Sequence, residues 1–224
     1  MGQHRGWTAL SFSEKTADGP DMASGVVDDV SADMQNGSLQ RTLVIFSHGK
    51  ESGPDGRKIR HLAAIARQRG ALTLSPSYVD LSCPEQRVQR LLGLSLPAHD
   101  NLVLVGSSMG GYVSVVASSV LRPQGLFLIA PAVYMPGYAQ NTYNARALRI
   151  AVVCGRQDEV IPVTHGIQFA HEHQADLHVV EGDHRLSRQL HQLGRLFELF
   201  LDTLQLCSGH AQEQINDSGH EKNG

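Results

Sequence analysis

The sequence predicts a doubly wound α/β domain, a mainly parallel sheet with helices on both of its faces. Two observations support this fold class. Short apolar runs alternate with segments of helical period, which is the order of a parallel sheet built with right-handed crossover helices. Nearly every residue in those runs is apolar, as in strands that are covered on both faces. The runs are residues 43–46, 71–74, 102–105, 126–130, 150–154 and 177–180.

Two of the helical segments have a clear apolar face. One face combines Ile59, Leu62, Ala63 and Ala66, whose spacing is that of an amphipathic helix. No internal repeat accompanies these segments, so a single domain is expected. A longer apolar stripe follows the last run and contains Leu186, Leu190, Leu193, Phe197, Phe200 and Leu204.

The two ends of the 224-residue chain are polar. Residues 1–40 show no sustained period and contain Gly-Pro and Asn-Gly breaks. We expect them to form a flexible tail, in which residues 25–27 could still pair as a short edge strand. Residues 205–224 hold few large apolar side chains and are expected to be disordered. The domain is therefore placed at residues 41–204.

Composition excludes several classes of protein. The 19 basic residues are outnumbered by 22 acidic ones, a net charge of −3, so no nucleic-acid partner is implied. No apolar stretch approaches the ~20 residues of a membrane span. The three cysteines have no C-x-x-C spacing and the N-terminus lacks a secretory signal, so we expect a reducing, cytoplasmic location. The oligomeric state stays open.

The run at residues 102–105 leads into a G-x-S-x-G motif formed by Gly106, Ser108 and Gly110, and a helical segment follows. In this setting the motif predicts a strained turn that exposes the serine at the end of the strand, with glycines allowing strand and helix to pass closely. The helix N-terminus behind Ser108 favours a developing anion. The simpler alternative is an ordinary turn in which Ser108 only caps the helix.

A second strand-to-loop junction lies upstream of this motif. Residues 43–46 lead into Ser47, His48, Gly49 and Lys50. This loop can aim the backbone N–H of Lys50 at the same point as the N–H of Met109, and two such donors would form an oxyanion hole. His48 is expected to shape the loop, and it is also counted among the candidate substrate-binding residues.

Two further polar side chains follow later apolar runs. Asp158 comes just after residues 150–154, and His184 comes after residues 177–180. Asp158 could instead be a turn or cap aspartate, and its neighbour Glu159 is the alternative acid. The order Ser108, Asp158, His184 predicts acyl transfer to water, in which His184 moves the serine proton and Asp158 orients the imidazole.

On these motifs the chain resembles the α/β-hydrolase superfamily over about residues 41–204. The H-G loop, the G-x-S-x-G turn, the G-R-x-D-x-x-I-P segment and the G-D-H loop match in order. The compact chain is similar to small capless bacterial serine esterases and dienelactone-hydrolase-like proteins. The resemblance implies serine esterase chemistry with no metal and no organic cofactor. Dienelactone hydrolases use a cysteine nucleophile, whereas position 108 is a serine.

The stretch between the fourth and fifth apolar runs is too short for a helical cap domain, so we expect a shallow pocket. Residues 131–144 would form its wall, and Tyr134 and Met135 are the candidate substrate-binding residues, with Tyr138 and Tyr143 nearby. The alternative is a surface loop with packed aromatic side chains.

The other polar features of the sequence favour a structural or solvent-exposed role. His171, His173 and His178 lack the spacing of a metal motif and are expected at the surface. The glycine-rich loop at residues 50–58, with Arg156 and Arg185, could favour anionic substrates or could simply be solvated. Cys83 is expected to be a spectator thiol.

The sequence therefore favours a serine hydrolase acting on a small carboxylic ester or thioester through an acyl-enzyme intermediate. The motif does not separate an esterase from a thioesterase, an amidase or a peptidase. One alternative is a lyase, transferase or cofactor-free oxygenase with the same fold. Another is a binding protein that has no catalytic activity.

Overall fold

The computed structural model describes the backbone of residues 41–217 and the side chains of residues 41–204. The expected N-terminal tail, with its possible strand at residues 25–27, lies outside the described residues, as do residues 218–224. None of the helices in the described part has the length and apolarity that a membrane span needs.

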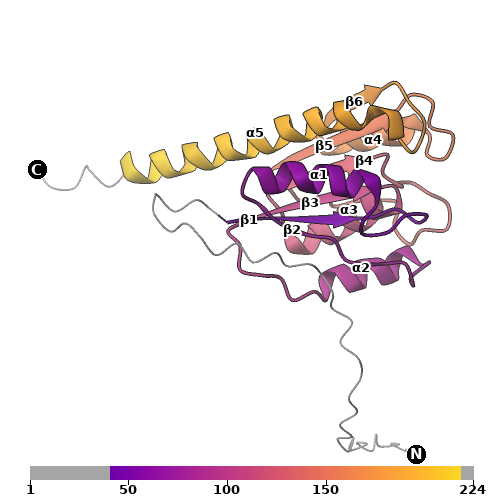
Figure 1. The fold of residues 1–224 in the computed structure, drawn as a ribbon, viewed down its shortest axis with the longest axis horizontal. Coiled ribbons are helices and arrows are strands. Elements are labelled where there is room, and N and C mark those ends of the chain that lie inside the picture. The colour runs from indigo at the N-terminus through magenta and orange to yellow at the C-terminus, as the bar shows by residue number, and fades with distance from the viewer. Residues whose placement is uncertain (1–40, 218–224) are drawn as a thin grey trace, which may run out of the picture. The chain divides into compact units, whose positions relative to one another are not determined.

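Six parallel strands form one sheet, and all six predicted runs are strands (Figure 1). Their order across the sheet is β2-β1-β3-β4-β5-β6. The predicted fold class is confirmed. The strands are β1 (Thr42–Ser47), β2 (Leu72–Leu74), β3 (Asn101–Ser107), β4 (Gly125–Ile129), β5 (Arg149–Gly155) and β6 (Asp176–Val180).

The strand order reverses between β1 and β3. From β1 the chain crosses to β2 on one side, and it then returns to place β3 on the other side of β1. Ligands of open parallel sheets bind at such a switch point, beyond the carboxyl ends of the strands. Ser47 of β1 pairs with Gly106 of β3 at this end, so the two loops that follow β1 and β3 are brought side by side.

Helices cover both faces of the sheet. One face is covered by α1 and α5, and the other by α2, α3 and α4 (Figure 1). A short 3-10 turn, Ser187–Gln189, precedes the last helix. The helices are α1 (Arg57–Gln68), α2 (Pro84–Leu92), α3 (Met109–Leu121), α4 (Val163–His173) and α5 (Leu190–Asp217).

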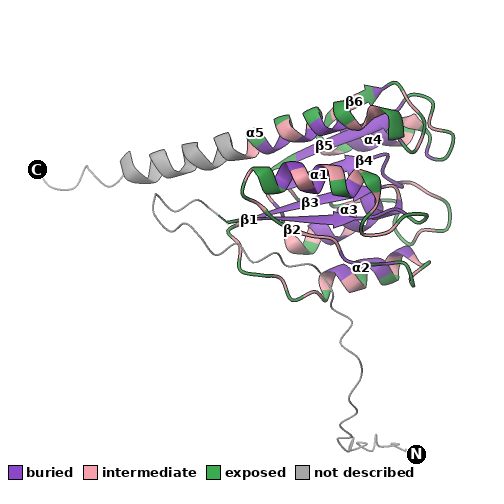
Figure 2. Ribbon diagram, viewed as in Figure 1, coloured by how far each residue is buried: buried purple, intermediate pink, exposed green. Residues whose placement is uncertain are grey.

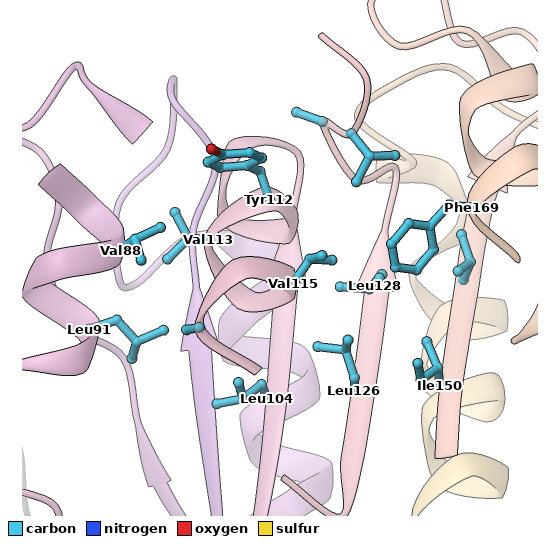
Figure 3. Close-up of a cluster of buried hydrophobic side chains, with 14 of the residues drawn as sticks. Val88, Leu91, Leu104, Tyr112, Val113, Val115, Leu126, Leu128, Ile150 and Phe169 are labelled. Atoms are coloured by element: carbon cyan, nitrogen blue, oxygen red, sulfur yellow. The ribbon is translucent and has the colours of Figure 1, made fainter. Parts of the chain in front are cut away.

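Along the central strands, alternate side chains pack into two different cores, one on each face of the sheet. Leu104 and Leu126 pack with Val88 of α2, Val113 of α3 and Phe169 of α4 (Figure 3). The intervening strand residues face α1 and α5, where the core includes Val44, Phe46, Val103, Phe127 and Phe197. Because both faces are buried (Figure 2), these strands consist almost wholly of apolar residues.

Three details differ from the sequence prediction. The edge strands β2 and β6 are only partly covered, with Leu72 36% and Val179 38% exposed, because an edge strand has a neighbour on one side only. Leu186 packs in the core but precedes α5, and its φ of 50° places it in the left-handed region. The backbone of α5 continues to Asp217, beyond the boundary expected at residue 204. No proline interrupts residues 190–217, so the helix can propagate.

Candidate active site

Ser108 forms the sharp turn between β3 and α3. Its φ of 56° and ψ of −122° lie outside the regions that non-glycine residues favour, and such a conformation costs on the order of 1–3 kcal/mol. Backbone hydrogen bonds to the segment that follows β4 help to hold it in place. The amide of Ser108 donates to the carbonyl of Ile129 at 2.9 Å, and the amide of Ala132 donates to the carbonyl of Ser108 at 3.0 Å.

Glycines at 106 and 110 make this turn possible. A Cβ added to Gly106 would lie 2.3 Å from the carbonyl oxygen of Gly110, and one added to Gly110 would lie 1.9 Å from the carbonyl oxygen of Ser47. Both distances are far inside van der Waals contact. The start of α3 therefore packs directly on the ends of β1 and β3, as the motif predicts.

Ser108, His184 and Asp158 form a chain of hydrogen bonds. His184 Nε2 lies 3.0 Å from Ser108 Oγ, and His184 Nδ1 lies 2.8 Å from Asp158 Oδ2. These three residues come from three loops at the carboxyl ends of β3, β5 and β6. The structure thus brings together the three side chains that the sequence order singled out. Glu159, the alternative acid, takes no part in this chain.

The surroundings of Asp158 keep it ionised. Its side chain is 2% exposed, and burial by itself would raise the pKa of the carboxyl. The bond to His184 and the amides of Ile161 and Val160 outweigh burial, so the pKa of Asp158 lies below its ordinary value. Because an ionised carboxylate only accepts hydrogen bonds, Nδ1 of His184 carries the proton. Nε2 of neutral His184 is then free to accept the Ser108 hydroxyl proton.

Direct contacts join the two loops that carry Asp158 and His184. The amide of Gln157 donates to the carbonyl of Gly182 at 2.9 Å, and the amide of Gly182 donates to Gln157 Oε1 at 2.7 Å. The side-chain amide of Gln157 also donates to Glu181. These bonds fix the distance between the two loops and so support the imidazole–carboxylate contact.

The H-G loop lies against Ser108. A Cβ added to Gly49 would lie 3.3 Å from Ser108 Cβ, so the backbone of this loop adjoins the serine. In the described part of the chain, the amides of Lys50 and Met109 have no hydrogen-bond acceptor. Both amides are therefore available, and their use as an oxyanion hole remains a proposal.

His48 is buried with both ring nitrogens bonded inside the protein, which argues against its place among the candidate substrate-binding residues. The side chain is fully buried. Its Nδ1 donates to the carbonyl of Gly49 at 2.8 Å, and its Nε2 accepts from the amide of Tyr78 at 2.9 Å. Burial lowers the pKa of His48, in agreement with this neutral tautomer. His48 shapes the loop, as the sequence also suggested.

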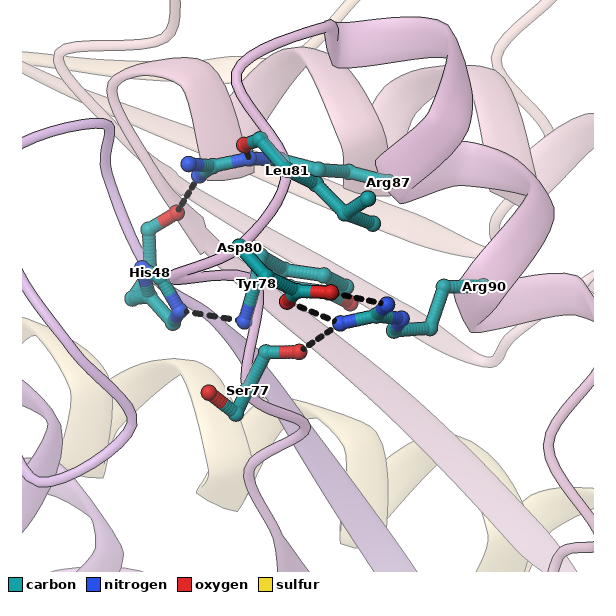
Figure 4. Close-up of polar contacts among 7 residues, drawn as sticks. All are labelled: His48, Ser77, Tyr78, Asp80, Leu81, Arg87 and Arg90. Atoms are coloured by element: carbon teal, nitrogen blue, oxygen red, sulfur yellow. Dashed lines mark hydrogen bonds and ion pairs between the residues drawn. The ribbon is translucent and has the colours of Figure 1, made fainter. Parts of the chain in front are cut away.

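Arg87 joins the H-G loop to α2 (Figure 4) and was not among the residues predicted from the sequence. Its guanidinium is buried, and it donates to the carbonyls of Leu81, His48 and Gly49. The signal was present in the sequence. Arg87 falls on the face of α2 that also buries Pro84, Val88 and Leu91, and a charged residue on an apolar face needs polar partners inside the protein.

The segment at residues 130–148 contains no helix, and its aromatic side chains pack together. Tyr134 Oη donates to Glu172 of α4 at 2.5 Å, and Tyr143 Oη accepts from the amide of Tyr134 at 3.0 Å. Tyr134 and Met135 both pack against the core formed with α2, α3 and α4. These contacts match the alternative of a packed aromatic loop, so a direct contact of Tyr134 or Met135 with substrate remains a proposal.

The remaining candidates have ordinary roles. No group of three or more metal-binding side chains occurs among the described residues, so His171, His173 and His178 do not form a metal site there. Arg156 pairs with Glu181, and Arg185 pairs with Glu51.

Two other side chains of this region have named partners. Cys83 donates to Glu85 at 3.1 Å. At the start of α1, burial lowers the pKa of Lys58 to about 8, and the negative charges of Asp158 and Asp183 act in the opposite direction.

Comparison with solved structures gives the same architecture. A protein from Xanthomonas campestris pv. campestris, assigned to the hydrolases of the alpha/beta superfamily, matches with a TM-score of 0.66 and 29% identity. The match covers 73% of this chain and 99% of that one. The chain has the α/β-hydrolase fold.

Two more distant structures share this α/β-hydrolase fold. Est1E from Butyrivibrio proteoclasticus matches with a TM-score of 0.64 and 15% identity, over 74% of this chain and 88% of that one. An α/β serine hydrolase without a lid from Xanthomonas campestris matches with a TM-score of 0.57 and 19% identity, over 74% and 83%. No family model matches the sequence, and the comparison with curated proteins finds no match.

Proposed function

We propose that the protein is a serine hydrolase that cleaves a small carboxylic ester or thioester. The observation that carries the proposal is the hydrogen-bonded chain from Ser108 through His184 to Asp158, on the strained turn where an α/β-hydrolase fold presents its nucleophile. The descriptions of the similar structures support hydrolase activity in general.

In the first half of the reaction, neutral His184 accepts the Ser108 hydroxyl proton at Nε2 while Oγ attacks the carbonyl carbon. Asp158, ionised and held by two backbone amides, stabilises the imidazolium that forms. The tetrahedral intermediate then expels the alcohol or thiol, which takes the proton from Nε2. An acyl group is left on Ser108.

In the second half, water replaces the leaving group. His184 takes a proton from the water, the hydroxide attacks the acyl carbon, and the proton returns to Ser108 Oγ as the acid departs. We assign the negative oxygen of both tetrahedral intermediates to the amides of Lys50 and Met109. Such donors, where they exist, are each worth on the order of 10²–10³ in rate.

The segment at residues 130–148 would border the acyl or alcohol group. It begins at the nucleophile, because the amide of Ala132 bonds to the carbonyl of Ser108. Its tyrosines pack against the apolar core, and the segment itself contains no helix that could cover the site. We therefore propose substrates of modest size, with Tyr134 and Met135 as part of that wall and with no metal or organic cofactor.

A screen of oxygen esters and thioesters with wild-type protein and Ser108→Ala tests the proposal. Esters of aromatic acids belong in the screen because Est1E has been determined with ferulic acid bound. We expect turnover by the wild type and none by a folded Ser108→Ala variant. Equal hydrolysis by both proteins would refute the assignment of Ser108. A product that contains no solvent oxygen would favour a non-hydrolytic reaction in the same fold, and complete inactivity would favour a binding protein.

A further inference from the structure

Arg87 is a buried cation with no acidic partner. It is 1% exposed and forms no ion pair with the described residues. Its Nε donates to the carbonyl of Leu81 at 2.7 Å, and its Nη1 donates to the carbonyls of His48 and Gly49, both at 3.3 Å. Burying a guanidinium without a carboxylate is costly. This cost indicates that the charge of Arg87 has a role at the H-G loop.

The carbonyl of Gly49 belongs to the same peptide unit as the amide N–H of Lys50. That unit is planar and trans, so its oxygen and its N–H point in opposite directions. The oxygen accepts from Arg87 Nη1 and from His48 Nδ1 at 2.8 Å. It also accepts from the amide of Ser52 at 3.5 Å and from the Ser52 hydroxyl at 3.4 Å. These four donors fix the orientation of the peptide unit, and with it the direction of the Lys50 N–H.

We propose that Arg87 is a positioning residue for the oxyanion hole, whose buried charge holds and polarises the Gly49–Lys50 peptide so that the Lys50 N–H stabilises the oxyanion formed at Ser108. The proposal rests on the proposed serine hydrolase function. A charged donor at one end of a peptide strengthens the hydrogen bond at the other end. The interior position of the charge also reduces its screening by water.

Because the oxyanion exists only in the tetrahedral intermediates and the flanking transition states, loss of this charge should reduce kcat and leave KM nearly unchanged. The obvious alternative is that Arg87 merely holds the loop in the folded protein. The two roles differ in their dependence on the substrate's carbonyl oxygen. A thionoester carries sulfur there, and sulfur is a weak hydrogen-bond acceptor, so its hydrolysis depends little on an oxyanion hole.

The experiment compares wild type, Arg87→Met and Arg90→Met on a matched ester and thionoester. Arg90 is a suitable control because it lies one turn further along α2 and holds the segment at residues 77–81, through Ser77 and Asp80, without touching the H-G loop (Figure 4). We expect Arg87→Met to lower kcat for the ester by about 10- to 100-fold, less than the loss of an oxyanion donor outright. The thionoester rate should change little, so the oxygen-to-sulfur rate ratio falls, and Arg90→Met should keep the wild-type ratio.

A pH profile of Arg87→Lys supplies a second readout if Arg87→Met does not fold. A buried lysine loses its proton more readily than an arginine, so the ester rate of this variant should fall at alkaline pH relative to the wild-type rate. Lys58, whose pKa is about 8, is common to both proteins and cancels in this ratio. The groups facing Arg87 are His48, Tyr78, Tyr138, Asp80 and Arg90. None of them provides that relative fall, because His48 is already neutral and burial raises the pKa of Tyr138 and, to about 12, that of Tyr78.

The outcomes separate this role from the proposed function. A wild-type oxygen-to-sulfur ratio in Arg87→Met, or an Arg87→Lys profile without the alkaline fall, overturns the role of Arg87 and leaves the serine hydrolase intact. If the wild-type protein shows no hydrolysis that depends on Ser108, both the role of Arg87 and the proposed serine hydrolase function are overturned.

Discussion

Replacing Gly110 with alanine should destabilise the protein and disturb its candidate active site together. The new Cβ would lie 1.9 Å from the carbonyl oxygen of Ser47 and 2.7 Å from that of His48, whereas non-bonded heavy atoms prefer roughly 3.5 Å. Removing this steric overlap therefore requires a backbone shift of more than about 1 Å. Overpacking costs about 1–3 kcal/mol when side chains can yield. Here both partners are backbone atoms, so we expect at least about 3 kcal/mol.

For a domain of this size, such a loss lowers Tm by at least about 6 °C, which thermal unfolding followed by circular dichroism measures. Gly53→Ala is the matched control, since its Cβ would meet only Val79 at 3.9 Å. That variant should keep the wild-type Tm or exceed it slightly, because alanine restricts the unfolded chain. A Gly110→Ala variant with an unchanged Tm would refute the argument that the turn requires glycine.

Other predictions concern single ionisable groups. Asp158→Asn should lower kcat for ester hydrolysis by about 10⁴-fold, because an amide cannot stabilise the imidazolium; a loss below tenfold would contradict its role. Since the folded protein holds the pKa of Asp158 low, the stability that it contributes is present above about pH 4, its unfolded value, and is lost as the pH falls further. The free energy of unfolding, measured with urea at pH 7 and pH 3, should thus decrease less between these pH values for Asp158→Asn than for wild type. Equal decreases would contradict the lowered pKa of Asp158. Burial raises the pKa of Cys154 to about 11, so iodoacetamide at pH 8 should alkylate it only after unfolding, as peptide mass spectrometry can check.

The sheet could be predicted from the sequence because each strand is a contiguous apolar run between polar segments. Six runs became six parallel strands, and the differences lie at their ends. Four strand residues pair within the sheet although they are polar: Thr42, Ser47, Asn101 and Ser107. The bonds that extend a strand are made by the backbone, so side-chain polarity does not mark where the pairing stops.

The candidate triad could be found because each member follows a predicted strand of the sheet. Ser108, Asp158 and His184 each stand a few residues past an apolar run, and parallel strands bring their carboxyl ends to one edge. No knowledge of side-chain packing was needed for that step.

The supporting contacts could not be found in the same way. Arg87 bonds to carbonyls 38 and 39 residues away in sequence, and only the folded chain brings α2 to the H-G loop. His48 was misplaced for a related reason. The amide of Tyr78, which donates to its ring, lies 30 residues away in sequence.

The most direct test of the account is covalent labelling of the purified protein with a fluorophosphonate, with the site located by mass spectrometry. An activated serine attacks this reagent, so we expect a single adduct on Ser108. Labelling should slow strongly in His184→Ala and Asp158→Ala, because these changes remove the base and the group that orients it. A folded wild-type protein that stays unlabelled at Ser108, or one that labels equally fast without His184, would contradict the central claim.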